Sequence, residues 1–425
     1  MSGDAITRRR GGAESGVAAR ALLNGRFDRI SCAQRKPLWS VTIWDKKFNS
    51  VATGKQTTAI KYHYLLAGDL KEKIVPGGDV KLLTTSETDW WTTEDKVSGL
   101  VSEGEIVSIP WGGNPNVQYF KGRFVTADNR IATSSDKTVL DNKFLYYFML
   151  AKRNTIGSFY RGAGLKHPEM AKVLDMEIPL PSIDVQRSFV YCMDNVSKVI
   201  AARKMQLDSL SQLVKSRFVE MFGDTFSNPM GWPSKTFEEA GKRLSDGPFG
   251  SNLKSSHYSD SGIRVIRLGN IGVGKFIDED RAFIPREHYE KLKKYTCRAG
   301  EIVIGTLGDP NLRACLVPAN IDVAVNKSDC VHYLPKKELL DEQYVCWYLN
   351  APGTLKLAAS MIHGQTRSRV SSGQIARMPI RIPPLALQRE FAAFVVKVDK
   401  LAFAARRRRD VAKQLYRAKI QEYFG

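Results

Sequence analysis

The sequence predicts an α+β protein in which two strand-rich domains follow one another along the chain, each with a long helix after it. Three observations support this fold class. A segment of 48 residues occurs twice, at residues 176–223 and 378–425, with 15 identical positions in an ungapped register. Both copies space their apolar residues alternately four and three apart, the period of a coiled coil. The remaining chain contains short β-branched runs broken by Gly and Pro, which are typical of strands.

The duplication predicts a pseudo-two-fold molecule in which the two long helices pair as an antiparallel coiled coil. The apolar positions run from Phe189 to Met221 in the first copy and from Phe391 to Tyr423 in the second. The first helix offers Leu and Ile where the second has several Ala, so that the backbones can approach closely. Alternatively, each helix packs only on its own neighbouring domain. In both copies prolines prevent an earlier helix start.

The expected domain order follows from these segments. Residues 1–30 are rich in Arg, Ala and Gly and predict a disordered extension to which we assign no function. Strand-rich domains are expected at 31–175 and 224–377. Residues 176–223 and 378–425 each supply a proline-containing segment and a long helix.

Short stretches of the two strand-rich domains resemble each other. Residues 103–113 read "EGEIVSIPWGG" and residues 299–309 read "AGEIVIGTLGD". A second pair of related stretches comes later in each domain: "KFLYYFML" (143–150) in the first and "YVCWYLN" (344–350) in the second. Repetition with divergence predicts that one scaffold is used twice for two different targets.

The charge of the chain predicts a polyanionic partner. There are 64 Lys and Arg residues against 44 Asp and Glu, a formal net charge of +20, and both halves of the chain are basic. Nucleic acid is favoured over an acidic membrane because no basic amphipathic anchor stands alone. The longest apolar run, 144–151, is too short to span a bilayer, and no secretory signal is present, so we expect a cytoplasmic protein.

Three patterns imitate catalytic motifs. The stretch "GNIGVGK" (269–275) has P-loop spacing, but a phenylalanine replaces the Ser or Thr that would bind Mg²⁺. Asp79, Glu94 and Lys96 could belong to a metal-dependent nuclease, although their loop-like surroundings favour solvated side chains. The prolines of "IPPL" (382–385) lack the polar and aromatic partners that hold a flipped base. We therefore predict no catalytic residue and no metal ligand.

The segments "IPLPSIDVQR" (178–187) and "IPPLALQR" (382–389) lie at the starts of the two long helices. Together with the alternating order of domains and helices, they resemble the specificity subunit of type I restriction-modification systems. The second domain adds "SDGPFGSNLKSSHY" (245–258), "GIRVIRLGNI" (262–271) and "HGQTRSRVSSGQIARMPIRIPP" (363–384), which are similar to the family's target-recognition domain. The resemblance covers about 390 of the 425 residues.

The first domain departs from the family pattern. It has "YRGAGLKHPEM" (160–170) in place of the stretch near 363 and no "GPFGS" that we can place. The family usually has Glu before the Gln of the repeated segment, whereas this chain has Val185 and Leu387. The missing first-domain stretches leave its base contacts less defined than those of the second domain, whereas the replacement of Glu is expected to alter a surface contact rather than the fold.

The resemblance implies a sequence-specific DNA-binding subunit that is not itself an enzyme. Each domain would read one half of a bipartite target, and the helices would set the spacing and dock methyltransferase subunits. The implied partners are double-stranded DNA, two DNA adenine methyltransferase subunits and restriction subunits that act as ATP-dependent translocase and nuclease. S-adenosylmethionine, ATP and Mg²⁺ would belong to those subunits, with no cofactor on this chain. The alternatives are a stand-alone DNA-binding regulator and a metal-dependent nuclease.

DNA readout requires donors that reach base edges and cations that bind phosphates. In the first domain the predicted DNA-binding residues are Tyr160, Arg161, Lys166 and His167. In the second domain they are Ser251, Asn252, Lys254, Arg264, Arg267, Asn270, Gln365, Thr366, Arg367 and Arg369. Alternatively, Arg264 and Arg267 are strand residues that pair with carboxylates.

Overall fold

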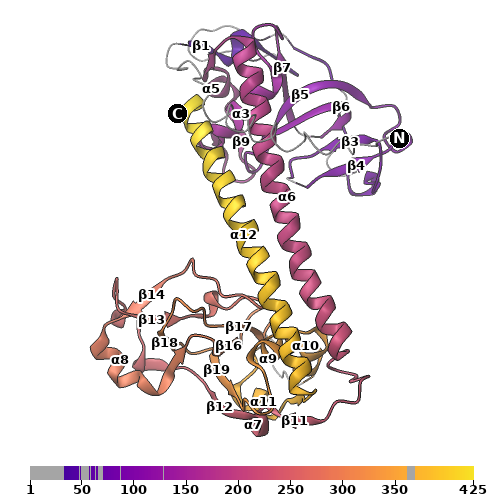
Figure 1. Ribbon diagram of the computed structural model, residues 1–425. Coiled ribbons are helices and arrows are strands. Elements are labelled where there is room, and N and C mark those ends of the chain that lie inside the picture. Colours follow the sequence, from indigo (N-terminus) through magenta and orange to yellow (C-terminus); the bar gives the residue numbers. More distant parts are fainter. Residues whose placement is uncertain are drawn as a thin grey trace, which may run out of the picture. The chain divides into compact units, whose positions relative to one another are not determined.

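The computed structural model describes residues 33–46, 48, 57, 59–62, 64–65, 70–86, 88–127, 129–360 and 369–425. The expected extension at 1–30 lies outside these residues. The chain divides into two compact units. The first unit comprises Met1–Ala202 with Arg409–Gly425, and the second comprises Arg203–Arg408. Each unit therefore contains one strand-rich domain and a part of both long helices (Figure 1).

The first unit is built on one six-stranded sheet. In spatial order its strands are β2 (Thr42–Trp44), β7 (Asn129–Ser134), β5 (Ser102–Pro110), β6 (Gln118–Thr126), β3 (Val80–Leu83) and β4 (Trp90–Thr92). Neighbours are antiparallel except β3 and β6. The helices are α2 (Leu38–Val41), α3 (Asn142–Ala151), α4 (Arg153–Ser158) and α5 (Met170–Leu174), and β8 (Tyr160–Arg161) with β9 (His167–Pro168) forms a hairpin. Buried residues of α3, among them Phe144 and Phe148, form the core with β5 and β7.

The second unit has two four-stranded sheets. One contains β12 (Gly241–Ser245), β19 (Cys330–Pro335), β16 (Ile302–Gly305) and β17 (Arg313–Leu316). The other contains β14 (Ala282–Ile284), β13 (Ile263–Ile266), β18 (Val323–Asn326) and β15 (Thr296–Arg298). The helices are α7 (Phe237–Ala240), α8 (Arg286–Leu292), α9 (Glu342–Leu349), α10 (Pro352–Ala359) and α11 (Ser372–Arg377).

Strand pairing shows that both units have the same fold. In the first unit β5 pairs with β6 over most of their length, whereas in the second unit β16 pairs with β17 and β15 pairs with β18. The parallel pair of β3 with the end of β6 corresponds to the parallel pair of β13 with β18. The long strand β5 of the first unit thus corresponds to β15 and β16 of the second, and the long strand β6 corresponds to β17 and β18. Gly300, with a φ of +81°, lies between β15 and β16 and interrupts the strand there.

The long helices are α6 (Ile183–Phe222) and α12 (Leu385–Phe424), each preceded by a short proline-containing strand. These strands, β10 (Glu177–Leu180) and β20 (Pro379–Arg381), pair antiparallel with β1 (Gln34–Pro37) and β11 (Ser234–Thr236), respectively. Since proline excludes an earlier helical turn, each helix begins directly after this pairing.

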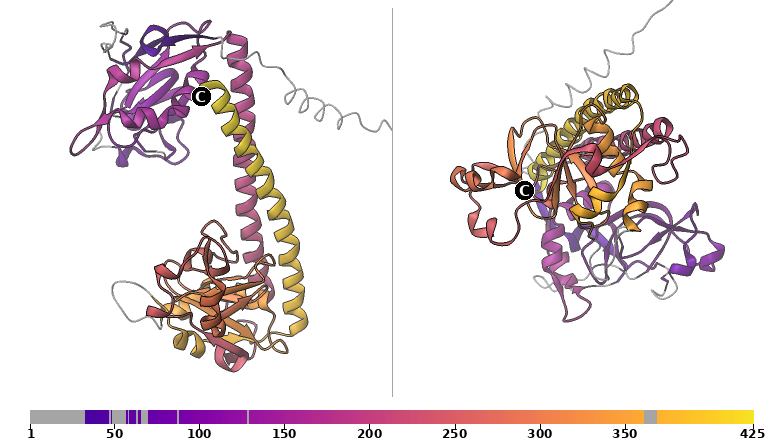
Figure 2. Two further views of the ribbon diagram at one scale, coloured as in Figure 1. Left: turned by 90° about the vertical axis from the view of Figure 1, so that its left-hand side faces the viewer. Right: turned by 90° about the horizontal axis from the view of Figure 1, so that it is seen from below.

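The two helices pair within each unit and run antiparallel (Figures 1 and 2). In the first unit the start of α6 lies against the end of α12, where the rings of Phe189 and Tyr423 are 4.2 Å apart. In the second unit the end of α6 lies against the start of α12, where the rings of Phe218 and Phe391 are 5.5 Å apart. The predicted fold class is therefore confirmed. In the described part of the chain, no helix is both long and apolar enough to cross a membrane.

Candidate nucleic-acid interface

A buried glutamine fixes the start of α6 to the first strand-rich domain. The carbonyl oxygen of the Gln186 side chain accepts the backbone N–H of Asp141 at 2.9 Å. Its amide nitrogen donates to the carbonyls of Val139 at 2.8 Å and Pro181 at 2.9 Å. Asp141 in turn caps α3, because its carboxylate accepts two backbone N–H groups of the first helical turn. Gln186 thus joins the proline segment, α6 and α3.

Gln388 repeats this arrangement in the second unit. Its side-chain oxygen accepts the backbone N–H of Asp341 at 2.9 Å, and its amide donates to Leu339 and Pro383 at 2.9 and 2.8 Å. Asp341 caps α9 in the same way. Neither glutamine has any exposed surface. The identical Gln of the repeated segment therefore has a structural function in both units, which periodicity alone does not indicate.

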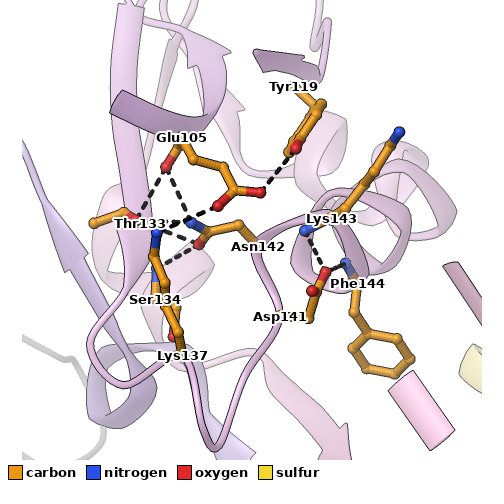
Figure 3. Close-up of polar contacts among 9 residues, drawn as sticks. All are labelled: Glu105, Tyr119, Thr133, Ser134, Lys137, Asp141, Asn142, Lys143 and Phe144. Atoms are coloured by element: carbon orange, nitrogen blue, oxygen red, sulfur yellow. Dashed lines mark hydrogen bonds and ion pairs between the residues drawn. The ribbon is translucent and has the colours of Figure 1, made fainter. Parts of the chain in front are cut away.

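A polar network at the start of α3 holds this helix on the sheet (Figure 3). The Asn142 amide donates to the backbone oxygen of Glu105 at 3.0 Å and accepts the N–H of Ser134 at 2.6 Å. The Glu105 carboxylate accepts the Tyr119 hydroxyl at 2.8 Å and the Lys137 ammonium at 3.3 Å. Burial alone would raise the pKa of Glu105, but these two donors lower it below its usual value. The side chains of Glu105 and Asn142 are thus used for structural bonds within the unit.

In the second unit, Arg313 holds two loops together. Its guanidinium donates to four backbone carbonyls, those of Ile271 at 2.7 Å, Leu307 at 3.1 Å, Pro310 at 3.1 Å and Leu268 at 3.3 Å. The loop that follows β13 therefore lies beside the turn between β16 and β17. We call these two segments, 267–271 and 306–312, the loop cluster of the second unit.

The loop cluster also contacts the segment in which the sequence predicts base readout. Leu307 pairs with Arg369 as an isolated antiparallel bridge. The Arg369 guanidinium forms an ion pair with Asp329 at 3.1 Å, lies 5.9 Å from the Phe249 ring and is 43% exposed. Arg369 thus presents a cation at the loop cluster. Gln365, Thr366 and Arg367 lie outside the described residues, and their DNA contacts stay a prediction.

The loop before β13 carries three further predicted contacts. Ser251, Asn252 and Lys254 are all exposed. The Asn252 amide donates to the carbonyl of Phe249 at 3.2 Å, and His288 of α8 lies 2.9 Å from the Asn252 carbonyl. These bonds order the loop and leave the Ser251 and Lys254 side chains facing solvent, so their DNA contacts also stay predictions.

The structure corrects the expectation for Arg264 and Asn270. Arg264 is only 5% exposed, pairs with Asp278 at 2.9 Å and lies over the Phe283 ring, and burial lowers its pKa. The Asn270 side chain is fully buried and forms three bonds, with the backbone groups of Arg267, Ile277 and Asp280. Both side chains are occupied within the unit and present no polar group to a base.

Arg267 also agrees with the alternative interpretation, because its guanidinium forms an ion pair with the Asp280 carboxylate.

The first unit has a cation, Lys81, at the strand position that corresponds to Arg264. Lys81 lies directly opposite Trp91 and its ammonium is 5.2 Å from that ring, just as Arg264 lies opposite Phe283 at 5.5 Å. The repetition in both units indicates a structural cation on this strand.

We predict that Arg264→Ala lowers the free energy of unfolding by about 1–3 kcal/mol, because Asp278 loses a buried partner. Thermal unfolding of the full chain measures this loss. Arg281→Ala is the matched control, since Arg281 pairs with the same Asp278 at 2.6 Å but is 62% exposed. Arg281→Ala should lower the free energy of unfolding by less than about 1 kcal/mol. Equal effects of the two substitutions would contradict a structural function for Arg264.

In the first unit, the four predicted contacts differ in accessibility. Tyr160 is 4% exposed and its hydroxyl donates to the Pro110 carbonyl at 2.7 Å, so it is a core residue and the expectation is corrected. His167 is half-buried, with Nδ1 2.7 Å from the Trp111 carbonyl oxygen. Arg161 is 62% exposed and pairs with Glu169 at 3.1 Å, and Lys166 is exposed. Arg161, Lys166 and the half-buried His167 thus stay predicted DNA contacts.

The motifs that imitate catalytic sites have structural explanations. Arg123 forms ion pairs with both Asp79, at 2.8 Å, and Glu94, so that the two exposed carboxylates share one structural partner. In "GNIGVGK", Ile271 forms an isolated bridge with Phe276, the residue directly after the motif. No helix begins there, since the next helix among the described residues is α8 at Arg286. Within the described ranges, no group of three or more His, Cys, Asp or Glu side chains could hold a metal ion.

Two copies of one mixed fold with paired long helices define a class of protein: a tandem-repeat protein whose strongly basic chain favours a polyanionic partner. Residues 33–212 match the family model "Type I restriction modification DNA specificity domain". The chain is 19% identical over 324 residues to the Type I restriction enzyme MjaVIII specificity subunit of Methanocaldococcus jannaschii, covering 73% of this chain and 76% of that protein.

A solved structure shows the same fold. The S subunit of a type I restriction-modification system from M. genitalium matches with a TM-score of 0.61 at 14% identity, over 95% of this chain and 98% of that chain. These comparisons confirm the resemblance that the sequence indicates, to the specificity subunits of type I restriction-modification systems.

Proposed function

We propose that this chain is the sequence-specific DNA-binding subunit of a type I restriction-modification complex. Each unit reads one half of a bipartite target, and α6 and α12 set the spacing of the halves and dock methyltransferase subunits. The observation that carries the proposal is the repetition of one recognition fold with different loops in a chain of net charge +20. Such a charge supplies the phosphate attraction on which specific readout is built.

The proposed partners are two DNA adenine methyltransferase subunits and the restriction subunits. A duplicated chain mimics a two-fold dimer, so that two copies of one partner can bind equivalent surfaces. Large apolar side chains exposed on the long helices are the positions at which this proposal places such docking. They include Tyr191, Met205, Phe403 and Val411, each at least 60% exposed. In this proposal S-adenosylmethionine, ATP and Mg²⁺ are bound by the partners, and this chain is not a catalyst.

The test is a genome-wide map of methylated adenines in the source cells, with and without this chain. The proposal expects methylation at a bipartite sequence that disappears when the chain is absent. A stand-alone regulator would bind DNA without changing methylation. A metal-dependent nuclease would cleave DNA in the presence of Mg²⁺ as an isolated chain. Either result would replace the proposal.

We also predict that exchange of residues 224–377 for the equivalent domain of another family member changes only one half of the target. Each unit has its own core, and the connections to its long helices repeat around Gln186 and Gln388. Methylated-site maps of the exchanged chain and of the parent chain provide the measurement. Changes in both halves would show that the units do not read independently.

A further inference from the structure

The turn between β5 and β6 and the turn between β16 and β17 contain matching four-residue patterns that differ only at the second position. The first turn reads Gly113, Asn114, Pro115, Asn116, and the second reads Gly308, Asp309, Pro310, Asn311. Each pattern begins five residues before its following strand, which starts at Gln118 or Arg313. Both glycines have a positive φ, +91° and +110°, which glycine adopts without strain. The two tips therefore occupy equivalent positions in the two units.

Each tip is fixed by bonds from its own unit. In the first unit, the N–H of Gly113 donates to the carbonyl of Lys166 at 3.1 Å, and Nε of Arg153 donates to the Pro115 carbonyl at 2.5 Å. In the second unit, Arg313 donates to the carbonyls on both sides of Gly308 and Asp309, and Leu307 pairs with Arg369. The Asp309–Pro310 bond is cis. The tips thus lie beside Lys166 and Arg369, two of the predicted DNA contacts.

The tips differ at the second position, where one has a carboxamide and the other a carboxylate. Asn114 and Asp309 are both exposed, and neither side chain bonds to any residue that the structure describes. In a purely structural turn, Asn or Asp commonly accepts a backbone N–H two residues further on. Since both side chains lack that bond, turn formation does not account for them.

We propose that Asn114 and Asp309 are equivalent base-reading residues, one for each half of the target. The inference rests on the proposed function and deepens it. An Asn side chain can donate to N7 and accept from N6 of adenine in the major groove, whereas an Asp carboxylate can only accept, as from N4 of cytosine. Asn114 therefore reads adenine in the first half-site, and Asp309 reads cytosine in the second.

The charge around the tips fits this assignment. A carboxylate near DNA is repelled by the phosphates, so it is favourable only where a base donor and nearby cations compensate it. Arg369, which is 43% exposed, lies beside the second tip, and the exposed Arg161 and Lys166 lie on the hairpin beside the first. In both units the cations can bind phosphates while the tip reaches the base edges.

The test uses two reciprocal substitutions, Asn114→Asp and Asp309→Asn, in the full chain. Each chain selects binders from a pool of duplexes with randomised sequence, and the bound DNA is sequenced. We expect Asn114→Asp to change one position of the first half-site from adenine to cytosine, with a loss of the original preference of about tenfold or more. Asp309→Asn should make the opposite change in the second half-site. Each variant leaves the other half-site unchanged and thereby serves as the control for the other.

The outcomes separate this inference from the proposed function. If the parent chain selects no sequence, the proposed function and the inference both fail. If the parent selects a bipartite site and both variants, with unchanged thermal unfolding, select that same site, only the inference is overturned. Asn114→Ala and Asp309→Ala provide the second measurement, since each should relax one position to several bases without altering the others.

Discussion

Replacing Gln388 by leucine is expected to lower the free energy of unfolding of the second unit by about 3–5 kcal/mol. Leucine keeps the approximate volume but removes all three hydrogen bonds of the amide. The Asp341 N–H and the carbonyls of Leu339 and Pro383 would then stay buried without these partners. Each unsatisfied group costs about 1–3 kcal/mol, and the helix start, the cap of α9 and the proline segment all depend on this site.

Urea unfolding of the full chain, followed by hydrogen exchange to locate the opened region, measures the effect. Arg389→Ala is the matched control because Arg389 is the next residue on α12 and is exposed; its effect should stay within about 0.5 kcal/mol. Gln186→Leu should produce the same loss in the first unit. A loss below about 1 kcal/mol at Gln388 would mean that the polar contacts of this glutamine contribute little to stability.

Much of the fold can be predicted from the repeated segment. The sequence places the apolar positions from Phe391 to Tyr423 on the seam, and the structure buries most of them, including Val395, Val398 and Ala402. This succeeds because a period of 3.5 residues leaves few alternatives for a long helix. The prolines before each helix set its start in the same way.

The strand pairing could not be predicted, because pairing depends on long-range register. The sequence shows related stretches at 103–113 and 299–309, but not that one long strand of the first unit is divided into β15 and β16 in the second. Gly300 is the visible signal of the break, and its effect becomes clear only with its positive φ and the separate pairing on each side.

Site residues were harder to predict than elements because exposure depends on distant partners. Arg264 is buried by Asp278 and Phe283, which follow it by more than ten residues, and Tyr160 donates to Pro110, fifty residues earlier. Composition cannot distinguish such a cation from one that faces DNA. The tips at Asn114 and Asp309 are not visible in the sequence for a different reason. The ungapped match of 103–113 with 299–309 is one residue out of register at the turn, which hides the shared pattern.

A buried ion pair joins Asp45 and Arg130 in the first unit. The two side chains are 0% and 5% exposed and are 2.8 Å apart. Asp45 also accepts the Tyr64 hydroxyl and the backbone N–H of Ile131. We expect Asp45→Ala to lower the free energy of unfolding by about 3–5 kcal/mol, since it leaves Arg130 buried without its counter-charge.

The double variant Asp45→Leu with Arg130→Met tests the cause. An apolar pair of similar volume removes both charges, and such replacements are often neutral. The double variant should therefore regain most of the stability that Asp45→Ala loses, as measured by urea unfolding. If it is as unstable as the single variant, the lost bonds to Tyr64 and Ile131 or the packing around Asp45, rather than the unpaired charge, explain the loss.

The same pair connects stability to recognition. The Arg130 guanidinium lies 4.3 Å from the ring of Trp111, which directly precedes the turn that carries Asn114. At temperatures where the single variant stays folded, displacement of Arg130 should shift Trp111 and weaken selection in the first half-site. Selection in the second half-site should not change, because Asp309 lies in the other unit with its own support from Arg313. Sequencing of DNA selected by Asp45→Ala measures both halves at once, and equal losses in both would show that Trp111 does not support the first tip alone.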